Sequence, residues 1–411
     1  MIKRKTGCRI CKNEDLTKFL EFGPMPHANG FLDKDQLNSN EPLFPVNIYF
    51  CKNCGLVQLA DIVPKEVLFS TYPYFSSVSD TFKQHCEELA REIAERFIKS
   101  TEALVVEIGS NDGVLLKPIK RYTTKTLGIE PATNVAQVAQ SMGVDTIIDF
   151  FSKDIAENIV QTRGKADIIL ALNVFNHLND LDDVMEGIQI LLADDGIFII
   201  EVPYLLNLIT KRSFDTMYHE MHSYFSIKPL LELFKQFRME IFDVRKIDIH
   251  TGSIRVYVRK TKQNFKLYEP VSKLIEEEEE VGLYKLETYF KFAAEVVKLK
   301  NHLIRTLNSL KAEKKRIIGY GAAAKGNVLL NYCRIGIDIL DYIVDATPWK
   351  QGLYTPGMHI PVYPVEKFRS NMPDYILILP WNFAEEIMNK EPDYKEKGGK
   401  FIIPLPELKI I

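Results

Sequence analysis

The stretch LVVEIGSNDGVLL, residues Leu104–Leu116, decides how this chain is organised. Its first five residues, Leu104–Ile108, are mainly apolar and β-branched, which predicts a short buried strand. Gly109, Asn111 and Gly113 follow, and a second apolar run predicts the start of a helix. A strand that passes through glycines into a helix N-terminus lets a ligand approach the backbone closely. We therefore expect a nucleotide-type ligand here.

The spacing within this stretch distinguishes two kinds of nucleotide site. It reads Glu107-x-Gly109-x-x-x-Gly113, which differs from the GxGxxG of a dinucleotide-binding turn. Glu107 suits a cationic or hydroxyl-rich ligand better than a phosphate. The next predicted strand, Thr126–Ile129, ends in Glu130, where nucleotide folds place a ribose-binding carboxylate. The pattern resembles the S-adenosylmethionine (SAM) site of Rossmann-like methyltransferases; a plain strand–helix–strand unit with a glycine turn is the alternative.

Strands and helices alternate through the middle of the chain, which predicts a parallel, doubly wound α/β sheet. The predicted strands are Leu104–Ile108, Thr126–Ile129, Asp145–Ile148, Asp167–Leu172 and Gly196–Val202. Ligands of such sheets bind at the carboxyl ends of the strands. The residues expected around the cofactor are Glu107, Gly109, Asn111, Gly113, Glu130, Phe150 and Asn173. Phe150 is a candidate to pack on an adenine, and core packing is the alternative.

Two Cys-x-x-Cys pairs lie near the N-terminus. Their residues are Cys8, Cys11, Cys51 and Cys54. Two such pairs separated by a loop are typical of a zinc ribbon, in which four thiolates surround one ion tetrahedrally. Four protein ligands leave no open position, so we expect a structural Zn²⁺. Disulfides or a redox-active pair are the weaker interpretations in a cytoplasmic chain.

Length and composition limit the remaining possibilities. A chain of 411 residues predicts two or three domains, which we place at 1–70 (zinc-binding), 71–265 (SAM-binding) and 266–411 (linker helix and second Rossmann-like unit). A net charge of -3 gives no general attraction to nucleic acid. No apolar run approaches the roughly 20 residues of a membrane span, and the N-terminus carries no secretory pattern. We expect a cytoplasmic, monomeric enzyme without nucleic-acid or membrane partners.

Polar side chains gather in two segments that follow strands of this sheet. The segment NVFNHL, Asn173–Leu178, contains His177, and the segment FDTMYHEMHSYF, Phe214–Phe225, is richer still. It holds Tyr218, His219, Glu220, His222 and Tyr224. Such a cluster at the rim of a cofactor sheet is a candidate for general acid–base catalysis, and a metal site on the two histidines is the weaker alternative.

An aromatic, hydroxyl-rich segment precedes the SAM-binding unit. It reads FSTYPYFSSVSD, Phe69–Asp80, and leads into an amphipathic helix predicted at Thr81–Phe97. Tyr72 and Tyr74 lie within it. The segment is a candidate lid over the cofactor, and an ordinary connection packed on the core is the alternative.

The C-terminal part begins with helical periodicity from 270 to 315, which predicts one long linker helix. A second nucleotide-like unit follows in RIIGYGAAAKGNVLLNY, where glycines surround Lys325 before a helix near Asn327. A helix N-terminus with a lysine forms an anion site, so we expect the phosphates or base of a nucleotide-linked substrate there. The candidate substrate ligands are Arg255, Gly321, Lys325, Asn327 and Lys350. A degenerate Rossmann unit without a ligand, and a solvent-facing Arg255, are the alternatives.

Taken in order, these pieces resemble the SAM-dependent sugar C-methyltransferases of deoxysugar pathways, which carry an N-terminal zinc-binding domain. The resemblance covers nearly the whole chain. It rests on the two CxxC pairs, YPYFSSVSD, VVEIGSNDGVLL, NVxxH, EVPYLLNLI, FDTMYHE, HTGSIRVYV, GYGAAAKGNVLLNYC, VDATPWKQGLYTPGMHIPV and PWNFAEEI. It implies methylation at C-3 of a nucleotide-linked 4-keto-6-deoxysugar through an enolate.

The resemblance also implies which residues line the catalytic pocket. They are Tyr72 or Tyr74, His177, Tyr218 and Glu220, together with a second histidine that acts as the base. Met221 stands where the family carries that histidine, and a thioether cannot take up a proton. His222, His177 or Glu220 then becomes the candidate base. If the substrate needs no such base, O-methylation or methylation at another position of a nucleotide sugar is the alternative.

Overall fold

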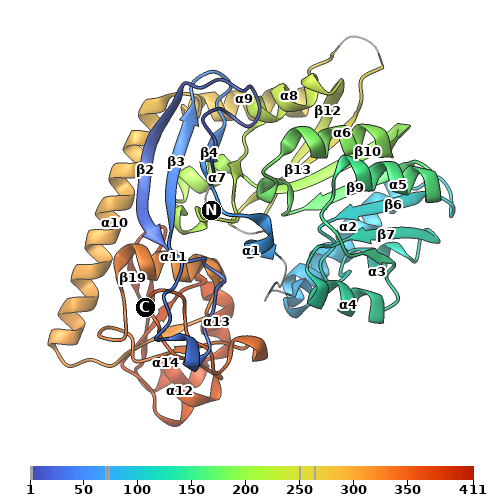
Figure 1. The fold of residues 1–411 in the computed structure, drawn as a ribbon. Helices are drawn as coiled ribbons and strands as arrows, with labels where there is room; N and C mark the ends of the chain where they lie inside the picture. The colour runs from blue at the N-terminus through green and yellow to red at the C-terminus, as the bar shows by residue number, and fades with distance from the viewer. Residues whose placement is uncertain (1–2, 70–71, 73–74, 250, 263–264) are drawn as a thin grey trace.

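The computed structural model describes residues 3–69, 72, 75–249, 251–262 and 265–411. The chain builds three larger sheets that follow one another along the sequence (Figure 1). A four-stranded sheet contains most of the N-terminal strands, a seven-stranded sheet occupies the middle, and a six-stranded sheet lies near the C-terminus. No helix among the described residues is long and apolar enough to cross a membrane.

The seven-stranded sheet has the order β12-β13-β10-β9-β6-β7-β8. Its strands are β6 (Leu104–Ile108), β7 (Lys125–Ile129), β8 (Thr146–Ile147), β9 (Ala166–Leu172), β10 (Leu192–Pro203), β12 (Met239–Ile247) and β13 (Ser253–Lys260). The five strands predicted from the sequence are all present and run parallel. β13 pairs antiparallel with β10, and β12 pairs antiparallel with β13, so the sheet ends in an antiparallel pair.

Helices cover both faces of this sheet, as its apolar strands require. They are α2 (Asp80–Phe97), α3 (Leu116–Ile119), α4 (Thr133–Ser141), α5 (Lys153–Arg163), α6 (Leu181–Leu191), α7 (Leu205–Thr210) and α8 (Ile227–Gln236). Alternate residues of β6 face opposite cores: Val105 packs with residues of α2, α3 and α4, and Val106 packs with residues of α5, α6 and α8. The Ser79 hydroxyl caps α2 by accepting a hydrogen bond from the Phe82 amide at 3.2 Å.

The N-terminal sheet includes a strand from the middle of the chain. Its order is β11-β4-β3-β2, built from β2 (Leu16–Met25), β3 (Phe44–Cys51), β4 (Val57–Leu59) and β11 (Ser223–Tyr224). A small pair, β1 (Lys3–Arg4) with β5 (Asp61–Ile62), and the short helix α1 (Lys65–Phe69) complete this region. Because β11 directly follows the Tyr218–His222 segment, the pairing of β11 with β4 fixes that segment against the N-terminal sheet.

The C-terminal sheet is also α/β, with a Rossmann-like arrangement. Its order is β16 (Val362–Tyr363), β15 (Ile343–Val344), β14 (Ile317–Tyr320), β17 (Tyr375–Ile378), β18 (Lys400–Ile403) and β19 (Lys409–Ile410). Among the described strands of this sheet, only β18 and β19 pair antiparallel, and the other pairings are parallel. The accompanying helices are α11 (Ala324–Cys333), α12 (Glu366–Ser370), α13 (Ala384–Lys390) and α14 (Pro392–Glu396).

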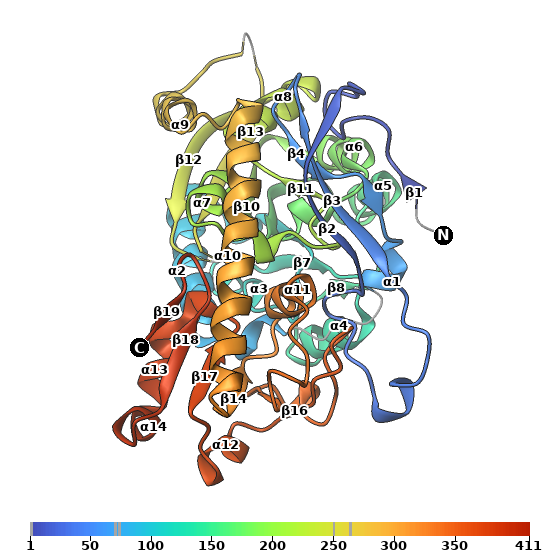
Figure 2. The same cartoon turned by 90° about the vertical axis from the view of Figure 1, so that its left-hand side faces the viewer.

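The predicted single linker helix is wrong, because two helices replace it. α9 (Glu269–Glu280) ends before Gly282, which adopts φ +76°, and α10 (Leu286–Ala312) then extends from the N-terminal sheet to the C-terminal unit (Figure 2). Within α9, Glu278 is fully buried and accepts hydrogen bonds from the Tyr204 hydroxyl at 2.7 Å and the Ile227 amide at 2.9 Å. One of the consecutive glutamates at the end of α9 therefore provides a buried anchor for the start of α8.

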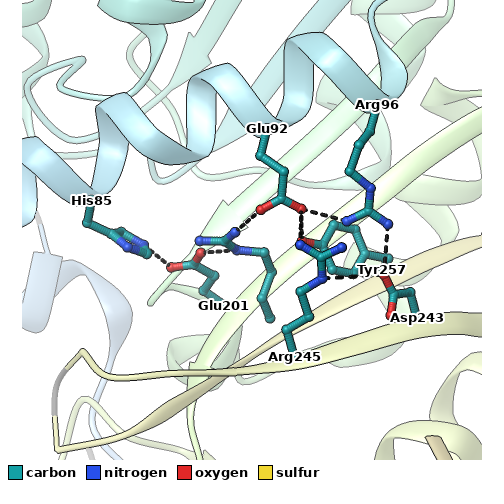
Figure 3. A network of polar contacts seen from close by, with 8 residues as sticks. His85, Glu92, Arg96, Glu201, Asp243, Arg245 and Tyr257 are labelled. Atoms are coloured by element: carbon teal, nitrogen blue, oxygen red, sulfur yellow. Dashed lines mark hydrogen bonds and ion pairs between the residues drawn. The ribbon is translucent and has the colours of Figure 1, made fainter. Parts of the chain in front are cut away.

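Arg255 belongs to an ion-pair network on the central sheet, which corrects its assignment as a substrate ligand. It is buried on β13, its Nε lies 2.5 Å from Glu201 Oε1, and its Nη1 lies 2.5 Å from Glu92 Oε2. Figure 3 shows the surrounding network, in which His85 reaches Glu201 and Arg245 lies near Glu92. A guanidinium with two carboxylate partners inside the protein has no free face for a phosphate, so Arg255 holds α2 on the sheet.

The Arg255→Met substitution is expected to destabilise the protein by about 3–5 kcal/mol, because it leaves the fully buried Glu201 carboxylate without its guanidinium. Equilibrium urea denaturation measures the effect. Arg245→Met is the matched control: Arg245 is 47% exposed and joins the same network through Glu92. We expect it to cost less than about 1 kcal/mol. Equal losses in the two variants would contradict the structural role of Arg255.

Candidate active site

One large cavity lies where the three sheets meet. Its volume is about 1720 Å³, and its walls come from the N-terminal region, the middle sheet and the C-terminal unit. Asn29 and Tyr72 line it from the N-terminal side, Asn173 from the end of β9, and Lys325 and Lys350 from the C-terminal unit. Residues far apart in the sequence therefore line one shared cavity.

The carboxyl ends of β6, β7 and β9 form one wall of this cavity. Gly109 adopts φ +67°, and a Cβ atom there would lie 2.7 Å from the Val174 side chain, so only glycine fits. Both Glu130 oxygens accept backbone amides, Oε2 from Asn111 at 3.0 Å and Oε1 from Ala132 at 2.9 Å. This geometry fixes the turn after β6 against the acidic end of β7.

Several buried polar atoms behind and along this wall have no hydrogen-bond partner among the described residues. They are Glu107 Oε2, Ser110 Oγ, Asp112 Oδ1 and both side-chain polar atoms of Asn173. Burial, with Asp112, Glu130 and Glu201 nearby, raises the pKa of Glu107 well above its ordinary value. Asn173 is the member of this set that lines the cavity, and together with the Glu130 carboxylate it offers amide and carboxylate groups to the hydroxyls and the amine that SAM carries. The residues present therefore fit SAM.

The predicted cofactor residues divide into two layers. Gly109, Asn111, Glu130, Phe150 and Asn173 line the cavity. Glu107 is buried in β6 and Gly113 lies where its missing Cβ makes room for Val144, so neither forms part of the cavity wall.

Replacing Glu130 with alanine is expected to weaken SAM binding by about 10- to 100-fold, the loss of one or two hydrogen bonds to a charged group. The substitution removes both the carboxylate on the cavity wall and the acceptor that fixes the Asn111 amide. Isothermal titration calorimetry with SAM measures the change. Glu102→Ala, at an exposed carboxylate paired with Lys125, is the control and should bind SAM as the wild type does.

Glu220 lies at the centre of a second polar cluster. It is fully buried, and Oε1 lies 2.8 Å from His27 Nε2 and 2.7 Å from Asn29 Nδ2. Tyr72 donates its hydroxyl to Oε2 at 3.0 Å. Burial opposes ionisation, but the His27 hydrogen bond and charge and the further donors hold the pKa of Glu220 below its ordinary value. Glu220 is a saturated anion behind the cavity wall and not an available proton acceptor.

Two imidazoles line the cavity beside this carboxylate. His177, in the turn after β9, stacks on Phe69 with ring centroids 5.6 Å apart, and its Nε2 has no partner among the described residues. His222 Nδ1 donates to the His177 carbonyl oxygen at 2.6 Å, so its Nε2 carries a lone pair, and this atom also lacks a described partner. Each of these imidazoles therefore has a ring nitrogen without a described partner, as a neutral base requires.

The remaining residues of the Tyr218–Tyr224 segment have different surroundings. Tyr218 and Met221 line the cavity, and Met221 Sδ accepts a contact from Asn176 Nδ2 at 2.6 Å. His219 does not line the cavity, and its Nε2 lies 3.0 Å from the Phe44 carbonyl oxygen. Among the described residues, His219 and His222 belong to no group of three or more side chains placed to hold a metal ion. Tyr74 lies outside the described residues.

The C-terminal candidates also separate. Lys325 and Lys350 line the cavity, where Lys325 Nζ donates to Asn382 Oδ1 at 2.5 Å and Lys350 Nζ donates to the Ala322 carbonyl at 2.9 Å. Gly321, with φ +84°, packs against Pro380 and does not line the cavity. Asn327 is buried and donates to the Ala28 carbonyl at 2.7 Å. Its side chain therefore holds an N-terminal loop and is not available to a ligand.

The four predicted zinc ligands come together. The sulfur atoms of Cys8, Cys11, Cys51 and Cys54 all lie within 4.8 Å of one another, with Cys8–Cys54 and Cys11–Cys51 at 3.5 Å. Tetrahedral coordination with Zn–S bonds of about 2.3 Å requires sulfurs about 3.8 Å apart. The cluster therefore fits one Zn²⁺ with every ligand position taken by protein.

The sequence analysis missed His27 and Asn29. Both lie in a turn-rich segment of the N-terminal region, and Asn29 lines the cavity. A histidine and an asparagine two positions apart in a turn give no signal of their own. Only the pairing of β11 with β4 brings Glu220 to them.

Comparisons with known proteins divide the chain as the structure does. Three family descriptions match in order: "Putative zinc binding domain" over residues 8–69, "Methyltransferase domain" over 80–241, and "C-methyltransferase C-terminal domain" over 248–406. The C-methyltransferase NovU of Streptomyces niveus is 35% identical over 404 residues, which cover 98% of this chain and 96% of the relative.

Other similarities cover a smaller share of the chain. A ubiquinone biosynthesis O-methyltransferase of Rhodopseudomonas palustris (strain BisB5) is 30% identical over 114 residues, 26% of this chain and 44% of the relative. The crystal structure of magnesium protoporphyrin IX methyltransferase (ChlM) from Synechocystis PCC 6803 with bound SAM covers 44% of this chain and 79% of its own, at 14% identity and a TM-score of 0.33. The full-length similarity decides the matter: this chain belongs to the C-methyltransferase family, as a SAM-dependent enzyme with a structural zinc site.

Proposed function

We propose that this enzyme methylates C-3 of a nucleotide-linked 4-keto-6-deoxysugar, and that His177 removes the C-3 proton. The observation that carries the proposal is the shared cavity. One space is lined by the SAM-binding wall, by a histidine with an unpartnered Nε2, and by Lys325 and Lys350. A sugar carbon acid with an anionic nucleotide diphosphate has complementary groups for each of these features.

The chemistry requires a base because a carbon nucleophile must first lose its proton. Bound SAM supplies an electrophilic methyl group. His177 Nε2 accepts the C-3 proton and becomes part of an imidazolium, while the electron pair of the C–H bond moves into the enolate of the 4-keto group. The enolate carbon is then the nucleophile for the methyl group. The reaction requires that the cavity hold C-3 in line with the methyl group, and residues from all three parts of the chain are available to do this.

The charges around the two histidines favour His177 as this base. The Glu220 carboxylate acts on His177 and favours its protonated form, although burial still leaves the pKa below its ordinary value. Burial and the positive charge of Arg9 act on His222 and lower its pKa to about 3. A nearby carboxylate strengthens a base because it stabilises the conjugate acid. His177 has such a carboxylate in Glu220, whereas the charged group that acts on His222 is the Arg9 guanidinium.

The other residues of the cluster have supporting roles. Glu220 is the fixed anion that balances the imidazolium, and Tyr72 and Tyr218 line the same side of the cavity. Met221 fills space against Asn176 and takes no part in proton transfer. The absence of a histidine at Met221 is thereby compatible with enolate chemistry.

The pH dependence of kcat/KM follows from the neutral state of this base. Burial lowers the pKa of His177 below about 6.5, the ordinary value of an exposed histidine. Because only the neutral imidazole accepts a proton, activity should be constant above that value and fall as the pH drops through the lowered pKa. A pH–rate profile measures this acidic limb. A limb centred above pH 7 would contradict the assignment of His177.

Product analysis tests the proposed reaction. The protein is incubated with ¹³C-methyl-labelled SAM and a nucleotide-linked 4-keto-6-deoxysugar, and the product is examined by carbon NMR. We expect a one-bond coupling from the new methyl carbon to a sugar carbon identified as C-3. A methyl group on another carbon would overturn the position, and no methyl transfer to this sugar would overturn the substrate class.

The C-terminal contribution is tested on the same assay. Replacing Lys325 with methionine is expected to raise KM for the nucleotide sugar while KM for SAM stays unchanged, because Lys325 lies in the C-terminal wall. The same sugar without its nucleotide should be insensitive to the substitution.

A further inference from the structure

We propose that His27 and Asn29, on a loop of the N-terminal zinc-binding region, are positioning residues that hold Glu220 in the orientation in which its charge supports His177. This inference rests on the proposed function for the role of Glu220, and goes beyond it by making the zinc-binding region a part of the active site. Neither residue contacts the reacting carbon in this assignment. Both act through the carboxylate.

Three donors divide between the two oxygens of the Glu220 carboxylate. His27 Nε2 and Asn29 Nδ2 converge on Glu220 Oε1 at 2.8 and 2.7 Å, and the Tyr72 hydroxyl takes Oε2 at 3.0 Å. The carboxylate is fully buried, whereas His27 and Asn29 are only partly buried. Three donors from two separate segments therefore fix both the position and the plane of this side chain.

The loop that carries the two donors is itself held from the opposite side. Asn327, at the start of α11, donates to the carbonyl of Ala28, the residue between His27 and Asn29, at 2.7 Å. The Gly30 amide donates to the His27 carbonyl at 2.9 Å and closes the turn. The loop thus links the C-terminal unit, which holds Ala28, to the Glu220 carboxylate, which His27 and Asn29 hold.

Electrostatics explains why such a support is needed. A buried carboxylate without donors takes up a proton, because burial disfavours its charge. The titratable groups that face Glu220 are His27, Tyr72, His177 and His219. If Glu220 became neutral, His177 would lose the negative charge that favours its protonated form. The two N-terminal donors therefore set the strength of the base through the Glu220 carboxylate.

Substitution of His27 tests the assignment. His27→Phe keeps the ring volume and removes the donor, and we expect kcat to fall about 10- to 100-fold, the effect of losing a hydrogen bond to a charged group, with KM for SAM unchanged. His27→Gln retains an N–H donor and should recover kcat to within about threefold of wild type. Asn29→Asp places a second carboxylate beside Glu220 and should lower kcat at least as far as His27→Phe.

A second histidine–glutamate pair, which joins the N-terminal region to the C-terminal unit, is the control. His359 Nε2 lies 3.1 Å from Glu41 Oε2, and neither residue lines the cavity. His359 adopts φ +51°, which asparagine tolerates, so His359→Asn removes the pair without new backbone strain. We expect its kcat to match the wild type. Equal activity of His27→Phe and His359→Asn would overturn the positioning role.

A titration without substrate separates this inference from the proposed function. ¹³C-labelled histidine NMR follows the pKa of His177 in the full-length protein, and we expect a lower value in His27→Phe than in the wild type. If the wild type fails to methylate the keto-sugar, the proposed function falls, yet this titration still decides the inference. An unchanged His177 pKa in His27→Phe would overturn it.

Discussion

Replacing His177 with glutamine is expected to lower kcat by about 10²- to 10⁴-fold, the contribution of a general base. His222→Gln is expected to cost less than about tenfold in kcat, because His222 Nδ1 donates to the His177 carbonyl and serves the backbone of that turn. The two substitutions are alike in chemistry and lie in the same cavity, so their difference isolates the base. Steady-state kinetics on both variants provides the measurement.

Packing must be separated from proton transfer in this comparison. His177 stacks on Phe69, and a glutamine loses that contact. Phe69→Leu removes the same stacking while leaving the imidazole, and it should retain most of the activity. SAM affinity should be unchanged in all three variants. Full loss of turnover in His222→Gln with an active His177→Gln would reverse the assignment of the base.

The Cys8→Ser substitution is expected to remove zinc and unfold the N-terminal region. Structural Zn²⁺ contributes about 10–16 kcal/mol in zinc-finger peptides, which is as large as the whole free energy of unfolding of a typical domain, about 5–15 kcal/mol. Metal content by atomic emission and thermal unfolding measure the loss. Cys86→Ala, at a buried cysteine of α2 outside the metal cluster, is the control and should keep its zinc. A folded, active protein without zinc would contradict the structural role.

Loss of zinc should also abolish activity, because the metal cluster is linked to the catalytic turns. Arg9, between two of the zinc ligands, is buried, its amide donates to Gln58 Oε1 at 3.0 Å, and its guanidinium reaches Asn179 in the His177 turn at 3.3 Å. The Leu59 amide donates to the His222 carbonyl at 3.0 Å. Zinc therefore fixes the segments on which both cavity histidines lie.

Much of the fold was predictable because local patterns dominate it. The five parallel strands are short apolar runs, each followed by a turn, and they appear within four residues of the predicted bounds. The zinc cluster was predictable because two CxxC pairs have little other use. The SAM-binding unit followed from glycines and carboxylates that lie next to strand ends. The full-length relative adds that carbon is the acceptor, which sets the O-methylation alternative aside.

Three side chains were placed wrongly for one reason, which is long-range packing. Arg255 was assigned to a substrate because its partners Glu92 and Glu201 lie 163 and 54 positions away. Glu278 belongs to five consecutive glutamates, Glu276–Glu280, a pattern typical of an exposed helix face, although it is buried against α8. Asn327 was assigned to a ligand although it holds a loop 299 positions earlier. No local pattern contains such information.

The central claim is that a base in this cavity removes the C-3 proton of a 4-keto sugar. The most direct measurement uses heavy water and S-adenosylhomocysteine in place of SAM, so that no methyl group can be transferred. Mass spectrometry and NMR then follow deuterium at C-3 of the nucleotide-linked 4-keto-6-deoxysugar. We predict incorporation at C-3 with the wild type and none above background with His177→Gln. Absence of exchange in a wild-type preparation that methylates the same sugar, or unchanged exchange in His177→Gln, would contradict the account.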